Sequence, residues 1–268
     1  ADMRPRIKVL VDEQLDRVAE KGEMDVMRDL AHRLPVIVIC DMLGIPEEHR
    51  APFLAGSNVN GRILEPVPMT REELDLANRN TQMAGVYFNQ LCELRRREPR
   101  DDLTTELVKA EEAGDKLSAE ELQANIGLLF GAGHETTTNL IGNGLKCLLD
   151  APDQQRRLMN EPELIRSAIE EFLRIESSNQ LGNRITTCEA RIGDLVLAPR
   201  TQVTLCIAAA NRDPAQFENP DVLDIARSPN RHVAFGSGIH QCVGMGLGRL
   251  EGRIAIAAFL ARFPDYRL

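Results

Sequence analysis

The stretch FGSGIHQCVGMG, Phe235 to Gly246, sets a single cysteine, Cys242, among glycines and places His240 two residues before it. The apolar, periodic segment that follows predicts a helix beginning just after the cysteine. Backbone N–H groups and the positive end of a helix favour the thiolate form of a cysteine so placed. The loop can therefore present one soft, anionic sulfur ligand to iron.

Two other interpretations of this loop fit the residues less well. A structural zinc site needs about four ligands, and only His240 lies close to Cys242 in the sequence. A dinucleotide-binding loop follows the pattern G-x-G-x-x-G inside a strand–helix–strand unit. The G-S-G that starts at Gly236 lacks the third glycine of that pattern, and no such unit surrounds it.

A second unusual stretch, GAGHETTT, occupies residues 131–138 in a segment of helical periodicity, where Ser118 and Glu121 are expected to form a capping box. Glycine and threonine are poor helix formers. Small residues let a flat ligand approach the backbone, and a local opening of the helix would free carbonyl groups. Glu135 and Thr136 add an acid and a hydroxyl at this point. Close packing against another helix remains an open alternative.

The segment EEFLR, residues 170–174, places Glu171 and Arg174 on one face of a helix that is expected to start near Pro162. Such a pair is usually a solvated surface ion pair of small energy. The flanking residues here are apolar, so we expect the pair to be buried and to need a further partner. The candidate partner is Arg227 in the segment LDIAR.

Composition and charge narrow the classes of function. The 268 residues carry 41 acidic and 32 basic side chains, a net charge of −9, which argues against nucleic acid or an anionic membrane as the main partner. No apolar stretch is long enough to span a bilayer, and no secretory signal opens the sequence. Six scattered cysteines without a C-x-x-C pair predict free thiols in a reducing compartment. We expect a cytoplasmic protein with a small-molecule or protein partner.

Helical periodicity dominates the chain, and strand patterns are confined to a short part of it. Helices are expected over residues 4–21, 25–44 with a break near Pro35, 71–99, 118–150 and 244–263. A small β region is expected over residues 185–199 and 201–210. The pattern predicts a mainly α fold with a small β region, in a single domain over residues 1–268.

Taken together, the motifs resemble the cytochrome P450 superfamily and its soluble bacterial branch. FGSGIHQCVG is similar to its heme-binding loop, AGHETT to its oxygen-activating helix and EEFLR to its buried Glu/Arg pair. The motifs stand in the order of the family along practically the whole chain. Such proteins are about 400 residues long, so this chain is expected to be the central and C-terminal part of one, with an incomplete fold.

The resemblance implies a role for each matching residue. Cys242 would be the axial ligand of the iron of heme b, iron protoporphyrin IX. Glu135 and Thr136 would be the catalytic acid and alcohol that manage proton delivery to oxygen. His240 and Arg184 would pair with heme propionates, with a plain surface position as the alternative for each. The other implied residues contact the heme (Phe235, Gly236, Gly238, Gly244, Ala132 and Gly133) or form a structural ion network (Glu171, Arg174 and Arg227).

The implied activity is that of a heme-thiolate monooxygenase, an oxidoreductase that inserts one atom of O2 into a small or medium apolar substrate. Electrons from NAD(P)H would arrive through a ferredoxin and ferredoxin reductase, because no flavin or iron–sulfur segment is present. Ser178 and Asn179 stand where relatives often carry proline and a small apolar residue, so a polar group on the substrate is compatible with the resemblance. The alternatives are a peroxygenase or heme isomerase on the same fold, and a truncated or degenerate heme-binding scaffold without turnover.

Overall fold

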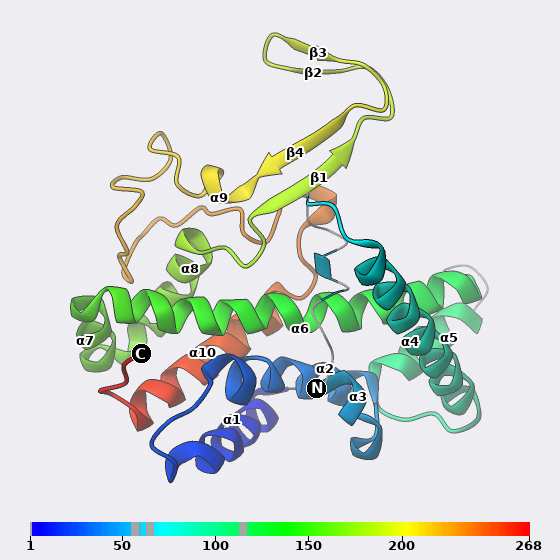
Figure 1. The fold of residues 1–268 in the computed structure, drawn as a ribbon, viewed down its shortest axis with the longest axis horizontal. Coiled ribbons are helices and arrows are strands. Elements are labelled where there is room, and N and C mark those ends of the chain that lie inside the picture. The colour runs from blue at the N-terminus through cyan, green and yellow to red at the C-terminus, as the bar shows by residue number, and fades with distance from the viewer. Residues whose placement is uncertain (1, 55–58, 60, 63–66, 113–116) are drawn as a thin grey trace. The chain divides into compact units, whose positions relative to one another are not determined.

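The computed structural model describes residues 2–54, 59, 61–62, 67–112 and 117–268. The chain divides into two compact units, residues 1–139 and 140–268. Helices dominate both units and the strands are few and short, which confirms the expected mainly α class with a small β region (Figure 1). The expectation of one domain over the whole chain remains a prediction.

The described residues of unit 1 form helices joined by loops. A π-helical turn (Met27–Ala31) ends just before α2, so the expected break lies slightly before Pro35, which sits in the first turn of α2. Proline is tolerated there because the first N–H groups of a helix have no partner within the helix. The α-helices are α1 (Arg4–Ala19), α2 (Arg33–Leu43), α3 (Ala51–Leu54), α4 (Arg71–Arg97), α5 (Leu103–Glu112) and the first part of α6 (Ala119–Asp150).

Capping residues explain where the two longest helices begin. The Thr70 hydroxyl accepts a hydrogen bond from the Glu73 N–H at 3.2 Å, and the Glu73 carboxylate accepts one from the Thr70 N–H at 2.8 Å. Ser118 and Glu121 make the same reciprocal pair at 3.2 and 2.8 Å before α6, the longest helix in Figure 1, so the expected capping box is confirmed.

The core of unit 1 is an apolar cluster contributed by α2, α4, α5 and α6. Each fully buried side chain of this kind contributes roughly 1.5–3 kcal/mol relative to an exposed one. The apolar face expected for α1 is also buried: Ile7, Leu10, Val11, Leu15 and Val18. The cluster itself consists of Val36, Ile39, Cys40, Leu43, Ile45, Phe88, Leu91, Cys92, Val108, Leu122 and Ile126.

Unit 2 packs its helices closely through glycine. A Cβ added to Gly144, in the second part of α6, would come within 2.7 Å of Ile256 in α10 and 2.9 Å of Phe172 in α8. One added to Gly252 would come within 3.1 Å of Ile169. The helices and turns of this unit are α7 (Pro152–Asn160), a 3-10 turn (Pro162–Leu164), α8 (Ile165–Ile175), α9 (Ile207–Ala210), a second 3-10 turn (Gly238–His240) and α10 (Met245–Arg262).

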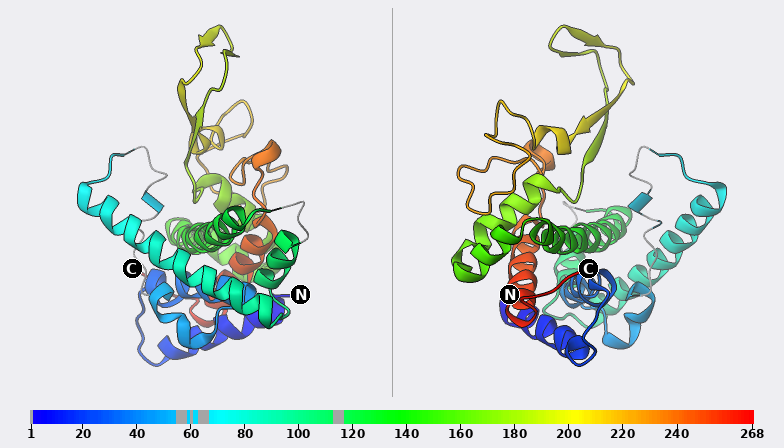
Figure 2. Two further views of the ribbon diagram at one scale, coloured as in Figure 1. Left: turned by 90° about the vertical axis from the view of Figure 1, so that its right-hand side faces the viewer. Right: turned by 60° about the vertical axis from the view of Figure 1, so that its left-hand side comes forward.

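The small β region of unit 2 consists of two antiparallel pairs. β1 (Leu181–Ile185) pairs with β4 (Gln202–Cys206), with Leu181 opposite Cys206, and β2 (Ala190–Ile192) pairs with β3 (Leu195–Leu197). The β2–β3 hairpin is inserted between β1 and β4 and extends from the end of that pair (Figure 2). The expected β region is therefore confirmed, but it begins earlier, at Leu181, and the end of its second expected segment, residues 207–210, forms α9.

Two further findings concern the thiols and the helices. All six cysteines are free, as their spacing predicted. In the described ranges, no helix combines the length and the apolar character needed to cross a membrane.

Candidate functional site

The Cys242 loop is closed by backbone hydrogen bonds. The Cys242 N–H donates to the Phe235 carbonyl at 2.8 Å, and the Gly236 N–H donates to the Val233 carbonyl at 2.9 Å. Between them a 3-10 turn is closed by the Gln241 N–H, which donates to the Gly238 carbonyl at 3.1 Å. The loop therefore brings the cysteine back beside Phe235 immediately before α10 begins.

Two glycines of this loop occupy the left-handed region, which L side chains rarely adopt. Gly236 has φ +68° and Gly238 has φ +66°. At Gly236 an added Cβ would also lie only 3.2 Å from the His240 carbonyl oxygen. Gly244 has φ −85°, and an added Cβ there would make only an ordinary 3.9 Å contact with the Cys242 sulfur. Backbone geometry therefore requires glycine at positions 236 and 238 and not at 244.

Two aliphatic residues close to the cysteine in the sequence are exposed. Ile239 and Val243 are 98% and 90% exposed, whereas Cys242 is half-buried. His240 is exposed as well. A loop that carries a soft sulfur and exposed aliphatic side chains offers both a metal ligand and apolar contact area to a flat, apolar partner.

Arg184, the other residue expected at a propionate, lies on β1. Its side chain is exposed, and Nη1 donates to the neighbouring Asn183 carbonyl at 2.8 Å. This is the contact of a surface strand residue, and the roles expected of Arg184 and His240 toward a propionate remain predictions.

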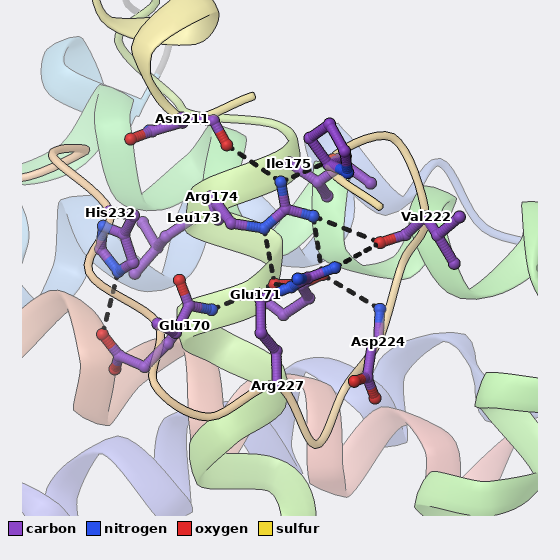
Figure 3. Close-up of polar contacts among 12 residues, drawn as sticks. Glu170, Glu171, Leu173, Arg174, Ile175, Asn211, Val222, Asp224, Arg227 and His232 are labelled. Atoms are coloured by element: carbon purple, nitrogen blue, oxygen red, sulfur yellow. Dashed lines mark hydrogen bonds and ion pairs between the residues drawn. The ribbon is translucent and has the colours of Figure 1, made fainter. Parts of the chain in front are cut away.

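Glu171 lies at the centre of a buried ion network on α8 (Figure 3). Arg174 donates to both of its carboxylate oxygens at 2.8 Å, and Arg227 Nε lies 3.1 Å from each of them. The Asp224 N–H and the Asn230 side chain donate at 3.0 Å. Glu171 and Arg174 are fully buried, which confirms the expected burial and the expected third partner.

The two arginines of this network also hold the long loop that follows α9. Arg174 Nη1 donates to the carbonyls of Asn211 and Pro220 at 2.9 and 2.6 Å. Arg227 donates to the carbonyls of Glu218 and Val222 at 2.8 and 3.1 Å. A buried charge is tolerable when all its hydrogen-bonding groups find partners, so the network ties this loop to α8.

Two side chains near the network escaped prediction. The Asn211 side chain accepts from the Val233 N–H and donates to Ser177 Oγ, both at 2.8 Å, which anchors the segment leading to the cysteine. Glu170 accepts from Arg249 and His232. Burial opposes ionisation of Glu170, but these hydrogen bonds outweigh it and lower its pKa to about 2. For Glu170, the signal in the sequence was the doubled glutamate of EEFLR.

The stretch GAGHETTT forms an uninterrupted part of α6, so the expected local opening of the helix is wrong. Thr136 Oγ1 donates to the Ala132 carbonyl at 3.1 Å and Thr138 Oγ1 to the His134 carbonyl at 2.9 Å. These bonds supplement the ladder instead of breaking it, which is a common arrangement for threonine in a helix. Burial lowers the pKa of His134, whose Nδ1 lies 2.8 Å from the Phe130 carbonyl.

Some small residues of α6 pack against a neighbouring helix, and others are exposed. A Cβ added to Gly133 would come within 3.2 Å of the Ile39 side chain, so close helix packing accounts for this glycine. Ala132 and Thr136 are exposed, one turn apart. The half-buried Glu135 side chain lies so close to Gly61 that a Cβ there would collide with its carboxylate. Glu135 and Thr136 belong to unit 1 and Cys242 to unit 2, and their convergence on one ligand remains a prediction.

Comparisons with known proteins match residues 24–264 to the family described as Cytochrome P450. The chain is 43% identical over 267 residues to "Cytochrome P450 107B1" of Saccharopolyspora erythraea, covering 99% of this chain and 64% of that protein. It is 41% identical over 271 residues to "Vitamin D(3) 25-hydroxylase" of Pseudonocardia autotrophica, of which it covers 65%. The crystal structure of P450BioI in complex with hexadec-9Z-enoic acid ligated acyl carrier protein superposes with a TM-score of 0.91 at 40% identity, over 98% of this chain and 68% of that one.

The fold and these matches define a mainly helical class of heme proteins. The chain belongs to the cytochrome P450 family, which implies heme as the cofactor, and it spans about two thirds of the length of the relatives it matches.

Proposed function

We propose that the protein containing this chain is a heme-thiolate monooxygenase that inserts one oxygen atom from O2 into a small or medium apolar substrate. The observation that carries the proposal is the Cys242 loop. Two left-handed glycines and the Cys242–Phe235 backbone bond shape it, and the loop carries the exposed apolar side chains of Ile239 and Val243. A geometry this restrictive is not needed by an inert cysteine.

The residues present fit a heme. Cys242 would supply the single axial thiolate, Ile239 and Val243 apolar contact, and His240 and Arg184 positive or hydrogen-bonding partners for propionates. In the described part of the chain, no three His, Cys, Asp or Glu side chains gather into a metal site of another kind. Heme with a thiolate ligand supplies O2 activation and O–O bond cleavage.

On unit 1, the acid and the alcohol expected to handle protons are both present. Thr136 is an exposed residue, and its Oγ1 donates a hydrogen bond to the Ala132 carbonyl, from which the hydroxyl can turn toward a ligand. Glu135 is the neighbouring residue in the sequence, and its half-buried carboxyl is the candidate acid. An acid beside an alcohol favours use of O2, where protons must be delivered, over the peroxygenase alternative.

The names of relatives support an apolar substrate. One is a vitamin D3 25-hydroxylase, and one was crystallised in complex with an acyl carrier protein that carries hexadec-9Z-enoic acid. We extend to this protein only the substrate class, a largely apolar molecule. We also propose electron supply from NAD(P)H through a ferredoxin and ferredoxin reductase, and a cytoplasmic location, which suits six free thiols.

The experiment is the absorbance spectrum of the reduced, CO-bound protein, expressed from its complete coding sequence, followed by turnover assays. We expect a Soret band at the thiolate-ligated position and product formed with O2, NAD(P)H and a ferredoxin system. Product formed with hydrogen peroxide alone would favour the peroxygenase. A missing thiolate band would favour the scaffold without turnover and overturn the proposal.

A further inference from the structure

Glu170 precedes the central glutamate of the ion network and has a separate set of partners. Arg249 Nε donates to Oε1 and Nη2 to Oε2, both at 2.8 Å, so the guanidinium grips the carboxylate with two parallel bonds. His232 Nε2 lies 3.1 Å from Oε2. Such forked, charge-assisted contacts are the stronger and more directional kind of hydrogen bond.

The partners of Glu170 come from opposite ends of the Cys242 loop. His232 lies in the segment that leads into the loop, and Arg249 lies in α10, which leads out of it. Glu170 itself is on α8, which packs against α10. One carboxylate on a rigid helix therefore joins both ends of the loop.

Both partners of Glu170 also contact Phe235. The Arg249 guanidinium carbon lies 4.5 Å from the centre of the Phe235 ring, within cation–π range. The His232 ring centre lies 6.1 Å from that of Phe235. Since the Phe235 carbonyl accepts the Cys242 N–H at 2.8 Å, a chain of contacts runs from Glu170 to the cysteine.

The hydrogen bonds of His232 also set its ring orientation. Its Nδ1 accepts from the Ala234 N–H at 3.2 Å, so Nε2 carries the proton that is donated to Glu170. The His232 side chain is 3% exposed, whereas those of Glu170 and Arg249 are 23% and 26% exposed. The cluster is therefore shielded enough for its geometry to be maintained.

We propose that Glu170 is a positioning residue for the Cys242 loop: through His232 and Arg249 it holds Phe235 in place and thereby sets the orientation in which the cysteine sulfur is presented. The assignment of that sulfur as the heme ligand rests on the proposed function. The positioning of the loop does not, and it can be measured without heme.

The test compares Glu170→Gln with Glu163→Gln in the complete protein. Glu163 is exposed and lies in the turn before α8, so its substitution removes the same charge without touching the loop. Hydrogen exchange is followed at the amides of Cys242 and Gly236, and global unfolding is followed in parallel by urea titration. We expect exchange of the two loop amides to speed up at least about tenfold in Glu170→Gln, because local opening governs it, and to stay unchanged in Glu163→Gln.

The spectrum provides the second readout. In the reduced, CO-bound protein, Glu170→Gln is expected to lower the fraction of thiolate-ligated heme, with global unfolding changed far less than loop exchange. Arg249→Lys, which keeps the charge but loses the fork and the planar stacking, is expected to lie between wild type and Glu170→Gln. It also decides the question if Glu170→Gln fails to fold.

The outcomes separate the two proposals. Loop exchange that is equal in wild type, Glu170→Gln and Arg249→Lys overturns the positioning role, whatever the spectrum shows. Loop exchange that depends on Glu170 in a protein without any thiolate spectrum supports the positioning role and overturns the proposed function instead.

Discussion

The Glu171 network and the Cys242 loop lie in the same unit but differ in burial: the network buries charged groups, and the loop exposes apolar ones. Glu171 and Arg174 are fully buried, and the described donors and acceptors around them are supplied by the chain itself. Along the loop, Ile239 and Val243 are exposed and the cysteine is half-buried. The charged groups of Glu171 and Arg174 find all their partners within the chain, whereas the loop exposes apolar side chains next to a half-buried cysteine.

This difference indicates that the residues that stabilise the fold and the residues that bind a ligand are separate in this unit. A buried ion pair tolerates no missing partner, so the network is expected to respond to substitution through the free energy of unfolding. The loop carries few buried groups, so substitutions there are expected to alter ligand binding while the unit remains folded. The predictions below test that separation, beginning with the largest effect.

Cys242→Ala is expected to abolish the thiolate-type CO spectrum and all monooxygenation, because no other cysteine occupies a glycine loop before a helix. The folded state should survive, with an unchanged urea midpoint. Cys206→Ala, which removes an exposed thiol from β4, is the control and should retain the spectrum. A thiolate spectrum that persists in Cys242→Ala would show that the sulfur ligand has been misassigned.

Glu171→Gln is expected to lower the free energy of unfolding by about 3–5 kcal/mol, because it leaves Arg174 and the mostly buried Arg227 without their counter-charge. Urea unfolding, followed by circular dichroism, measures the change. Glu163→Gln removes an exposed carboxylate nearby and should change it by less than about 0.5 kcal/mol. Equal stability of the two variants would contradict the distinction between network and loop.

Thr136→Ala is expected to leave folding and heme binding intact, since the side chain is exposed and its hydrogen bond supplements an existing ladder. Proton delivery by such a group is typically worth about a hundredfold in rate. We therefore expect electrons from NAD(P)H to be diverted to peroxide, measured as product per NAD(P)H consumed. Thr136→Ser, which keeps the hydroxyl, should retain coupling, and full coupling in Thr136→Ala would refute the role.

Glu251 is a buried glutamate that contrasts with Glu171, because among the described residues it lacks the partners that would stabilise its charged form. It is fully buried, and in the described structure neither carboxylate oxygen has a hydrogen-bond partner. Burial raises its pKa from 4.5 to about 8. Between these values the unfolded chain releases a proton that the folded chain keeps, so the free energy of unfolding should fall as pH rises.

The free energy of unfolding is expected to fall by at most about 1.4 kcal/mol per pH unit. The fall is confined to the range between pH 4.5 and about pH 8. Glu251→Gln cannot titrate and should flatten this dependence, becoming more stable relative to wild type at pH 8 than at pH 5. Urea titrations at the two pH values measure the effect. Parallel pH profiles of variant and wild type would mean that Glu251 finds a partner.

The smallest expected effects concern a glycine of the Cys242 loop and a glycine of the helix that follows it. Gly236→Ala forces a side chain into the left-handed region against the His240 carbonyl, at a cost of roughly 1–2 kcal/mol that should appear as weaker heme retention. Gly246→Ala, inside α10 with open space around it, should instead stabilise the protein by roughly 0.5–1 kcal/mol. Thermal unfolding measures the stability of each variant, and the rate of heme transfer to apomyoglobin measures its heme retention.

Local signals in the sequence were sufficient for much of the fold. The capping box at Ser118, the presence of a small β region and the helix carrying Glu171 all depend on neighbouring residues, and all were confirmed. The opening expected in GAGHETTT was wrong because helix propensity ignores threonine hydroxyls that bond back to carbonyls one turn earlier. Propensity alone cannot distinguish a strained helix from a regular helix lined with small residues.

The sequence by itself determined the helical class, the glycine-framed cysteine and the Glu171–Arg174 pair, because each depends on residue spacing within a few turns of chain. Only the tertiary structure decided which partners complete these groups. Glu170 bonds to His232 and Arg249, and Glu251 is buried with no partner in the described structure. Those outcomes depend on which helices and loops pack together, and hydrogen bonds between residues far apart in sequence leave no periodic pattern to read.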